Sequence, residues 1–317
     1  AMEYCEKPVA FCCKDTANAK DIFEMALLLC GGRENFEAAP FLMHYSEPIS
    51  PLAYYGPAVD KIIFCAENMI PVINSPAPQA AGTAPATLAG TVVQGNAETL
   101  SGLVLHQLVQ PGAPFIAGAF TTIMDMQTTI FSYGACEMSL MTAALAQMAQ
   151  HYRVPFFGTA GTTDAKFCDA QAGAEAAFQI LTAAATGSGL VHDCGSWMDH
   201  GSLASPEFMV LVNDIVDAVD HFMKGIPLDE ENLALEVIHR VGPKGNFLND
   251  SHTFTHFRKV RYSEIFDRSV HDVWANSGSK TFEQRLQEVT LKKMEHRPEP
   301  LDAEIIKTLD EMQAGWN

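Results

Sequence analysis

The 317-residue sequence has few basic side chains, no apolar run long enough to cross a membrane and no CxxC pair. Lys and Arg number 20 against 38 Asp and Glu, which gives a net charge of −18 and argues against nucleic acid and anionic lipid as partners. Without a membrane span or a recognisable signal peptide, we expect a cytoplasmic protein that does not enter the membrane. The eight scattered cysteines indicate reduced core thiols instead of a disulfide framework.

Six short apolar runs recur along the chain, and most of them are followed by a longer stretch with helical periodicity, such as 136–152 and 205–225. The runs lie at residues 8–12, 41–45, 70–75, 114–119, 154–159 and 189–193. Apolar runs that alternate with helices are typical of a parallel sheet built from βαβ units. Because the pattern never changes along the chain, we predict a TIM-type (β/α) barrel instead of a doubly wound sheet.

A closed barrel of this type has eight units, and only six are found here. We therefore predict an incomplete barrel in residues 1–228, with six of eight units, and a helical extension packed on it in residues 229–317. The chain could be the C-terminal six-eighths of a longer barrel or a homologue that has lost its start; a complete six-stranded open sheet is the alternative. Unpaired edge strands would invite a second chain, so we expect a homo-oligomer.

The C-terminal ends of the strands carry function in such a barrel, so the residues there are the candidates. Tyr45 and Glu47 follow the second run and could offer a ring face and a carboxylate to a cation. Equally, Tyr45 could cap the core while Glu47 is solvated. Asn74 ends the third run, before a loop of proline and small residues that leaves room for a ligand or is simply an ordinary turn.

Phe120 and Thr121 follow the fourth run and begin a long connection, and long connections are usually functional. Gly161 and Thr162 lie in a glycine-rich turn after the fifth run. The spacing of this turn does not match a phosphate-binding P-loop, although backbone amides at a helix N-terminus there could hold an anion. A helix N-cap at Thr163 or Asp164 explains the same turn more simply.

His192 ends the sixth run and is followed by Trp197. A histidine in this position could donate a hydrogen bond or transfer a proton at neutral pH. With Cys194 it could begin a zinc site, although no third ligand is evident. A histidine whose hydrogen bonds are satisfied within the core is the alternative.

Five ordered motifs together carry a family resemblance. They are SEPISPL (46–52), FTTIMDMQTT with SYGACE (120–137), GTAGTTDAKFCDAQAGAE (158–175), SGLVHDCGS (188–196) and FLNDSHTFTHFR (247–258). Over essentially its whole length the chain resembles the trimethylamine methyltransferase superfamily, and in particular its pyrrolysine-free branch that acts on glycine betaine. Members have a (β/α)8 barrel longer than this chain, in agreement with the count of six units.

The resemblance implies a corrinoid-dependent methyltransferase of methylamine metabolism. Its cofactor would be cobalamin carried by a separate corrinoid protein that docks over the barrel mouth, with no metal bound directly. Displacement at a quaternary ammonium releases a neutral amine, so an enzyme without pyrrolysine suits a quaternary amine of the betaine type. Tyr45, Phe120 and Trp197 would form a partial cage around the cation.

In the same interpretation, Glu47, Asn74 and Thr121 would also contact the substrate. Its carboxylate would meet amides near Gly161 and Thr162, or His192, which is the predicted catalytic residue. Two other functions stay open: a catalytically inactive truncated paralogue that binds a methylamine or a corrinoid partner, and a zinc-dependent methyltransferase that moves a methyl group from cobalamin to a thiol.

Overall fold

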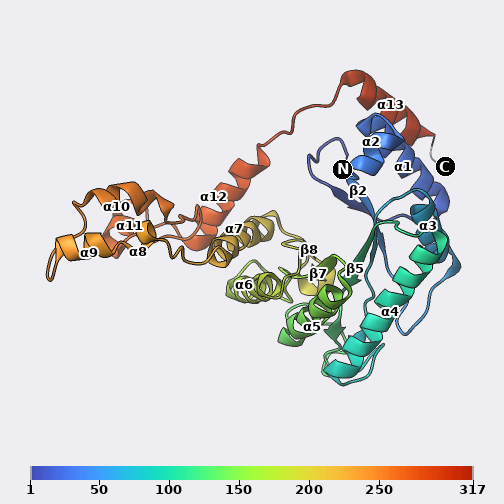
Figure 1. Ribbon diagram of the computed structural model, residues 1–317, viewed down its shortest axis with the longest axis horizontal. Helices are drawn as coiled ribbons and strands as arrows, with labels where there is room; N and C mark the ends of the chain where they lie inside the picture. The colour runs from blue at the N-terminus through green and yellow to red at the C-terminus, as the bar shows by residue number, and fades with distance from the viewer. Residues whose placement is uncertain (1, 316–317) are drawn as a thin grey trace.

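A curled sheet of six parallel strands is the centre of the fold in the computed structural model, which describes residues 2–315. Each predicted apolar run coincides with one strand, and the second strand extends one residue beyond its run. These are β1 (Val9–Phe11), β2 (Leu42–Ser46), β3 (Val72–Asn74), β5 (Phe115–Ala119), β7 (Phe156–Thr159) and β8 (Leu190–His192). They are neighbours in chain order, so the winding never reverses, which excludes a doubly wound sheet. Within the described residues the sheet is a half-barrel that remains open between β1 and β8 (Figure 1).

Helices between the strands, and one helix after the last strand, cover the outer face of the half-barrel. They are α1 (Thr16–Cys30), α2 (Arg33–Ala38), α3 (Gly56–Glu67), α4 (Leu88–Val109), α5 (Cys136–Tyr152), α6 (Ala170–Ala185) and α7 (Pro206–Met223). α3 packs on β2 and β3, α4 on β3 and β5, and α5 on β5 and β7. The helices predicted at 136–152 and 205–225 are therefore present as α5 and α7.

Strand alternation decides which side chains face the helices and which face the open interior. In β2, Leu42, His44 and Ser46 are buried under the helices, whereas Met43 and Tyr45 are only partly buried. Because successive side chains point to opposite faces of a strand, Tyr45 lies on the inner, concave face. The inner face is thus the less covered one and is open to a ligand.

A two-stranded ribbon extends the centre of the sheet beyond its C-terminal edge. β4 (Gln79–Ala80) pairs in parallel with β6 (Thr122–Ile123). The Phe120 amide donates to the carbonyl of Pro76 at 3.0 Å, so the chain leaving β5 stays beside the chain leaving β3. This ribbon was not predicted, and it fixes Phe120 above the inner face.

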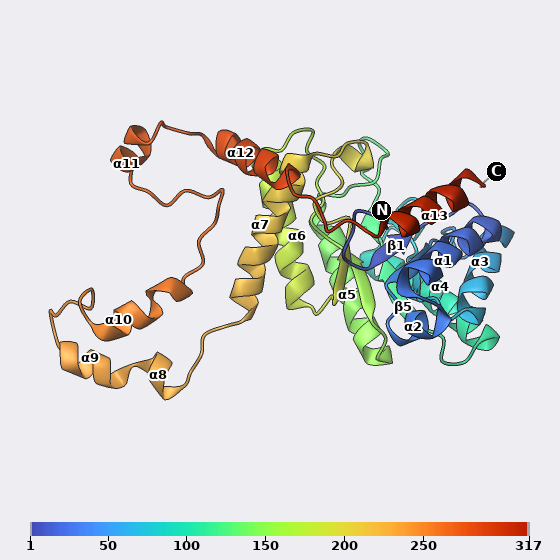
Figure 2. The ribbon, with the colours of Figure 1, turned by 90° about the horizontal axis from the view of Figure 1, so that it is seen from above.

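The C-terminal third contains small helices and one protruding segment. The elements are η1 (Asp199–Gly201), α8 (Glu230–Leu233), α9 (Leu235–Val241), α10 (Ser251–His256), η2 (Phe257–Lys259), α11 (His271–Asn276), α12 (Phe282–Met294) and α13 (Ala303–Ala314). α12 packs on α7 and α13 on α1. Residues 226–260, called the arm below, stand away from the sheet in both views (Figures 1 and 2).

No residue between 216 and 264 is buried, so the arm has no core of its own. The division into a barrel part up to residue 228 and an extension from residue 229 remains a prediction, and residues 316–317 of that extension lie outside the described residues. Among residues 2–315, no helix combines the length and the apolar character needed to cross a membrane.

Candidate functional site

A pocket of about 530 Å³ lies where the inner face of the half-barrel meets the loops after its strands. Its lining includes five of the predicted site residues, namely Tyr45, Glu47, Phe120, His192 and Trp197. The other lining residues are Ala10, Cys12, Tyr133, Phe157, Asp193, His200 and Gly201. The pocket therefore occupies the C-terminal ends of the parallel strands, where barrel sites are found.

His192 ends β8 and forms part of the pocket wall. Its ring stacks on Phe157, with centroids 4.7 Å apart and planes 5° apart. Nε2 lies 2.6 Å from the hydroxyl of Thr159, which in turn donates to the carbonyl of Ala119 at 3.0 Å. Nδ1 lies 3.1 Å from a carboxylate oxygen of Asp193. Both ring nitrogens therefore have protein partners, and the predicted catalytic role of His192 remains a prediction.

Asp193 connects three groups of the wall. It has a φ of 61°, in the left-handed region that Asp and Asn tolerate better than most residues. One carboxylate oxygen accepts a hydrogen bond from the indole Nε1 of Trp197 at 2.9 Å, and the other lies 3.5 Å from the Tyr133 hydroxyl and 3.1 Å from His192. A single carboxylate thus orients an indole, a phenol and an imidazole.

Aromatic rings form most of the remaining wall. The centroid of Tyr45 lies 5.7 Å from that of His192 and 6.1 Å from that of Phe157. Phe120 and Tyr133 form another pair in the wall, with centroids 5.1 Å apart. Ring faces attract cations through their quadrupoles, so such a wall favours an ammonium group.

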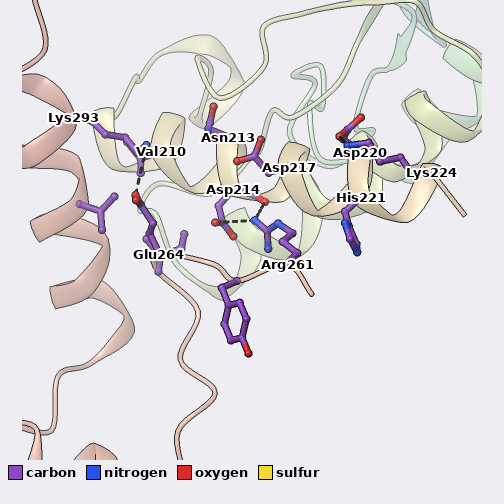
Figure 3. A pocket seen from close by; sticks show the side chains of 13 residues that line it. Val210, Asn213, Asp214, Asp217, Asp220, His221, Lys224, Arg261, Glu264 and Lys293 are labelled. Atoms are coloured by element: carbon purple, nitrogen blue, oxygen red, sulfur yellow. Dashed lines mark hydrogen bonds and ion pairs between the residues drawn. The ribbon is translucent and has the colours of Figure 1, made fainter. Parts of the chain in front are cut away.

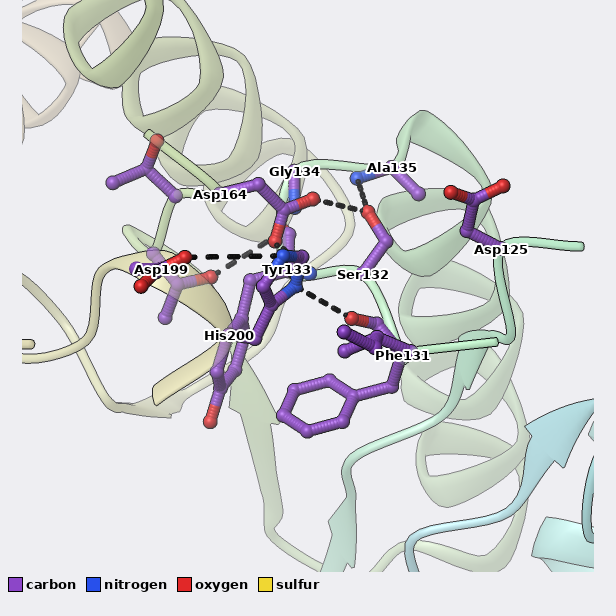
Figure 4. A network of polar contacts seen from close by, with 12 residues as sticks. Asp125, Phe131, Ser132, Tyr133, Gly134, Ala135, Asp164, Asp199 and His200 are labelled. Carbon is purple, nitrogen blue, oxygen red and sulfur yellow. Dashed lines mark hydrogen bonds and ion pairs between the residues drawn. The ribbon is translucent and has the colours of Figure 1, made fainter. Parts of the chain in front are cut away.

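The loop that carries Tyr133 is held by one acidic side chain (Figure 4). The carboxylate of Asp164 accepts hydrogen bonds from the Ser132 hydroxyl and from the amides of Tyr133 and Gly134, the last two at 2.8 and 3.0 Å. His200 Nδ1 lies 3.2 Å from the same carboxylate and 2.8 Å from the carbonyl of Phe131. Asp164 does not cap a helix, since α6 begins after the N-cap Asp169.

Two carboxylates dominate the electrostatics of the pocket. Burial raises the pKa of the Tyr45 hydroxyl, and the charges of Glu47 and Asp193 raise it further. Burial and the charge of Asp193 likewise raise the pKa of Tyr133. The pKa of the Cys12 thiol is raised by burial and by Glu47. No Lys or Arg from the described part of the chain lines this pocket, so its wall is negative.

Two predicted residues lie behind the wall and not on it. Asn74 is fully buried; its Nδ2 donates to the carbonyl of Glu98 at 3.2 Å, and its Oδ1 lies 3.3 Å from the Tyr54 hydroxyl. Thr121 is also fully buried, on the side of the chain that faces Gly95 of α4. Neither side chain lines the pocket, and their predicted contacts with the substrate remain predictions.

Gly161 and Thr162 are also outside the lining. Gly161 has a φ of 78°, and its carbonyl accepts from the amide of Gly195 at 2.8 Å. The Thr162 amide and hydroxyl both donate to the Gln179 side chain at 3.0 Å. The Thr162 amide thus belongs to a buried network that joins the turn to α6, and the predicted anion site at Gly161 and Thr162 remains a prediction.

Cys194 points away from the pocket and packs with the core between α6 and α7. Strand alternation would place it on the same face as His192, but the positive φ of Asp193 ends that alternation. In residues 2–315, no group of three or more His, Cys, Asp or Glu side chains is arranged to hold a metal ion.

Sequence reasoning missed five chemically informative wall residues, which are Cys12, Tyr133, Phe157, Asp193 and His200. Phe157 had a usable signal, because it is an inner-face residue of a predicted strand. Asp193 stands beside His192 in the SGLVHDCGS motif, and Tyr133 stands in the SYGACE motif. His200, in η1, had no comparable signal.

A second cavity, of about 440 Å³, lies on the outer side of α7 (Figure 3). Arg261 reaches from the following segment to Asp214, with 2.9 Å between its nitrogen and the carboxylate. Lys293 of α12 and Glu264 form a 3.7 Å pair at its edge. The first pair attaches the chain after the arm to α7, and the second attaches it to α12.

Comparison with known proteins gives a consistent result. The family model described as trimethylamine methyltransferase (MTTB) matches residues 1–314. The chain is 34% identical over 293 residues to trimethylamine methyltransferase MttB of Desulfitobacterium hafniense (strain DSM 10664 / DCB-2), covering 92% of this chain and 59% of that protein. It is 34% identical to the glycine betaine methyltransferase of D. hafniense (strain Y51), covering 83% and 55%.

A third relative, trimethylamine methyltransferase MttB of Methanosarcina barkeri (strain Fusaro / DSM 804), is 37% identical, with 88% of this chain and 56% of the relative covered. The chain thus spans between half and two thirds of the length of these relatives. Since the family model covers nearly all of its residues, the chain belongs to the trimethylamine methyltransferase family.

Proposed function

We propose that this chain provides the substrate pocket of a methyltransferase that moves a methyl group from a quaternary amine to cob(I)alamin on a separate corrinoid protein. The observation that carries the proposal is the pocket itself, in which ring faces and two carboxylates meet at the C-terminal ends of parallel strands. This combination suits a fixed positive charge. In the same proposal, the half-barrel is part of an eight-unit TIM-type barrel, and the helical extension from residue 229 packs on that barrel.

The proposed methyl transfer needs little acid–base catalysis from the protein. Cob(I)alamin on the partner would supply the nucleophile that takes the methyl carbon, and the bond from that carbon to nitrogen breaks with its electron pair on nitrogen. The leaving group is then a neutral amine that needs no proton. The chain's own residues bind and orient the ammonium group, with Tyr45, Phe120 and Trp197 as the ring faces.

A corrinoid protein would reach the substrate from the pocket mouth. Exposed apolar side chains lie on the loops after the strands, including Ile49, Leu52, Met126, Ile130 and Phe167. Exposed apolar groups gathered around a site are typical of interaction surfaces. They support a docking role for these loops. Among the described residues β1 and β8 each pair on one side only, and these edges would favour a homo-oligomer if no further barrel unit covered them.

Calorimetric titration of this chain with choline, glycine betaine, carnitine and trimethylamine tests the proposal. We expect at least one of the quaternary amines to bind, and binding to weaken in Phe120→Ala. Addition of a corrinoid protein in the cob(I)alamin state, followed by cobalt absorbance, then tests methyl transfer. Binding without transfer would favour an inactive binding paralogue, and no binding of any methylated amine would contradict the proposal.

A further inference from the structure

We infer that Thr159 is a positioning residue of the pocket: it keeps a proton on Nε2 of His192 and leaves Nδ1, opposite Asp193, as the nitrogen that gains or loses one. The inference deepens the proposed function and rests on it in one respect, the part that Asp193 takes in holding the ammonium group. The contacts that fix the protons all lie between described residues of β5, β7 and β8 and the turn that follows them.

Thr159 ends β7 on the inner face of the half-barrel. It follows Phe157 by two residues, so both side chains point to the same face, and it pairs in register with His192 of β8. Thr159 is 1% exposed, and it is not among the residues that line the pocket. It therefore acts on a ligand only through the ring of His192.

The hydroxyl of Thr159 has one proton and two close neighbours. Its oxygen lies 3.0 Å from the carbonyl oxygen of Ala119 and 2.6 Å from Nε2 of His192. A carbonyl oxygen can only accept, so without the Thr159 proton two buried oxygens would face each other unbonded, which is unfavourable. The proton therefore goes to Ala119, and the contact with Nε2 is a hydrogen bond only when Nε2 carries a proton and donates it to Thr159.

The other ring nitrogen faces a carboxylate. Nδ1 lies 3.1 Å from one oxygen of Asp193, and the other oxygen of Asp193 accepts from the Trp197 indole at 2.9 Å. The stacking of the ring on Phe157, with 5° between their planes, keeps the imidazole in the plane that both contacts require. Because Nε2 is occupied by its bond to Thr159, any proton that His192 takes up or gives away passes through Nδ1.

The position of the proton decides how much charge Asp193 presents to the pocket. When the neutral ring is protonated at Nε2, Nδ1 donates nothing to Asp193, and the charge of this carboxylate is available to a cation. A neutral ring protonated at Nδ1 would instead donate to Asp193, and a carboxylate that accepts a further hydrogen bond attracts a cation less. Thr159 thus sets how strongly Asp193 holds an ammonium group.

Nitrogen NMR of the whole chain with labelled histidine measures the proton positions, and His192→Gln identifies the signals of this ring. Above the pH at which an ordinary histidine titrates, we expect His192 to be protonated at Nε2. In Thr159→Val, which keeps the shape and removes the hydroxyl, the proton should move to Nδ1, and in Thr159→Ser it should stay on Nε2. A purely structural role of Thr159 would lower stability without exchanging the protonated nitrogen.

Thr142→Val is the matched control. Thr142 of α5 is also buried, but its hydroxyl has no hydrogen-bond partner among the described residues, so its loss should leave the His192 signals unchanged. Calorimetric titration with choline measures the consequence for the pocket. Thr159→Val should lower the affinity about fivefold, the weight of roughly one hydrogen bond, whereas Thr159→Ser and Thr142→Val should keep it.

The outcomes separate this inference from the proposed function. A neutral His192 protonated at Nδ1 in the unchanged protein would overturn the inference, and this spectrum decides even if Thr159→Val does not fold. The same protonated nitrogen in Thr159→Val, or an exchanged nitrogen with unchanged choline affinity, would overturn it as well and leave the proposed function standing. Absence of binding by every methylated amine, together with the expected spectra, would overturn the proposed function and leave Thr159 as the residue that fixes the protons of His192.

Discussion

The carboxylate of Asp193 lies 3.1 Å from Nδ1 of His192, the residue that precedes it in the chain. Neighbouring residues of a strand point to opposite faces, so this contact exists only because β8 ends at His192 and Asp193 has a φ of 61°. The same turn brings Asp193 within 2.9 Å of the Trp197 indole. One backbone turn therefore builds the acidic corner of the pocket.

Asp193→Asn should weaken the binding of a tetraalkylammonium ion about tenfold, because the amide keeps the shape and removes the charge. Asn also tolerates the left-handed backbone, so the turn should persist. Calorimetric titration with tetramethylammonium measures the effect. Asp220→Asn, an exposed carboxylate of α7, serves as the control. An unchanged affinity in Asp193→Asn would show that this carboxylate does not hold the cation.

Phe120→Leu should weaken choline binding by about 0.5–2 kcal/mol, because Leu fills similar space without a ring face. The neutral isostere 3,3-dimethylbutanol has the same shape without the charge, so its binding should change little. Phe167→Leu, at a 76% exposed position outside the wall, is the matched control. Equal losses for choline and for the neutral isostere would assign Phe120 a shape-filling role.

The sheet was predictable from sequence because each strand leaves a continuous apolar signature. Tyr45 and His192 followed from the same pattern, since both stand on inner-face positions at strand ends. The β4–β6 ribbon could not be predicted, because Gln79–Ala80 and Thr122–Ile123 are too short to show a period.

The part of the pocket wall that comes from loops depends on loop geometry, which leaves no periodic pattern in the sequence. Tyr133 reaches the wall because Asp164, 31 positions later, binds its amide. Gly161 and Thr162 were chosen as a helix N-terminus, but the helix begins at Ala170 and the turn is buried against Gln179. The ends of strands can be predicted from the local sequence, whereas contacts between loops that are distant in sequence cannot.

Asp164→Ala should reduce the free energy of unfolding by about 2–3 kcal/mol, because several donors converge on a half-buried carboxylate and would lose their acceptor. It should also weaken ammonium binding, since Tyr133 would no longer be held at the wall. Urea unfolding and calorimetric titration measure the two effects. Asp125→Asn, which changes a partly buried carboxylate near the start of the same loop, is the control and should change binding little. An unchanged free energy of unfolding in Asp164→Ala would show that this carboxylate does not hold the loop of Tyr133.

Two buried histidines predict a pH dependence of stability. Burial lowers the pKa of His44 to about 4, helped by the charge of Lys61, and burial alone lowers the pKa of His106 to about 4. Between about pH 4 and 6.5 the unfolded chain binds protons that the folded chain does not. The free energy of unfolding should therefore be highest above about pH 6.5 and fall as the pH is lowered through this window.

His106→Leu removes one of these two groups. The free energy of unfolding should then change less steeply with pH, by about 1.4 kcal/mol per pH unit between pH 4 and 6.5. Urea unfolding at pH 5, 6, 7 and 8 measures it. His271→Gln, at an exposed position of α11, should leave the slope unchanged. If the free energy of unfolding of His106→Leu depends on pH as steeply as that of the unchanged protein, other groups cause the acid sensitivity.

The arm should be the first part of the chain that trypsin cuts. Its helices span three to seven residues, and no residue between 216 and 264 is buried, so local opening there exposes little apolar surface. Cleavage after Arg240, Lys244, Arg258 or Lys259 should precede cleavage at Lys61, whose side chain is buried in the half-barrel. Mass spectrometry of the first fragments decides this. First cuts within α1–α7 would contradict the prediction, and protection that grows with protein concentration would show that a second copy covers the arm.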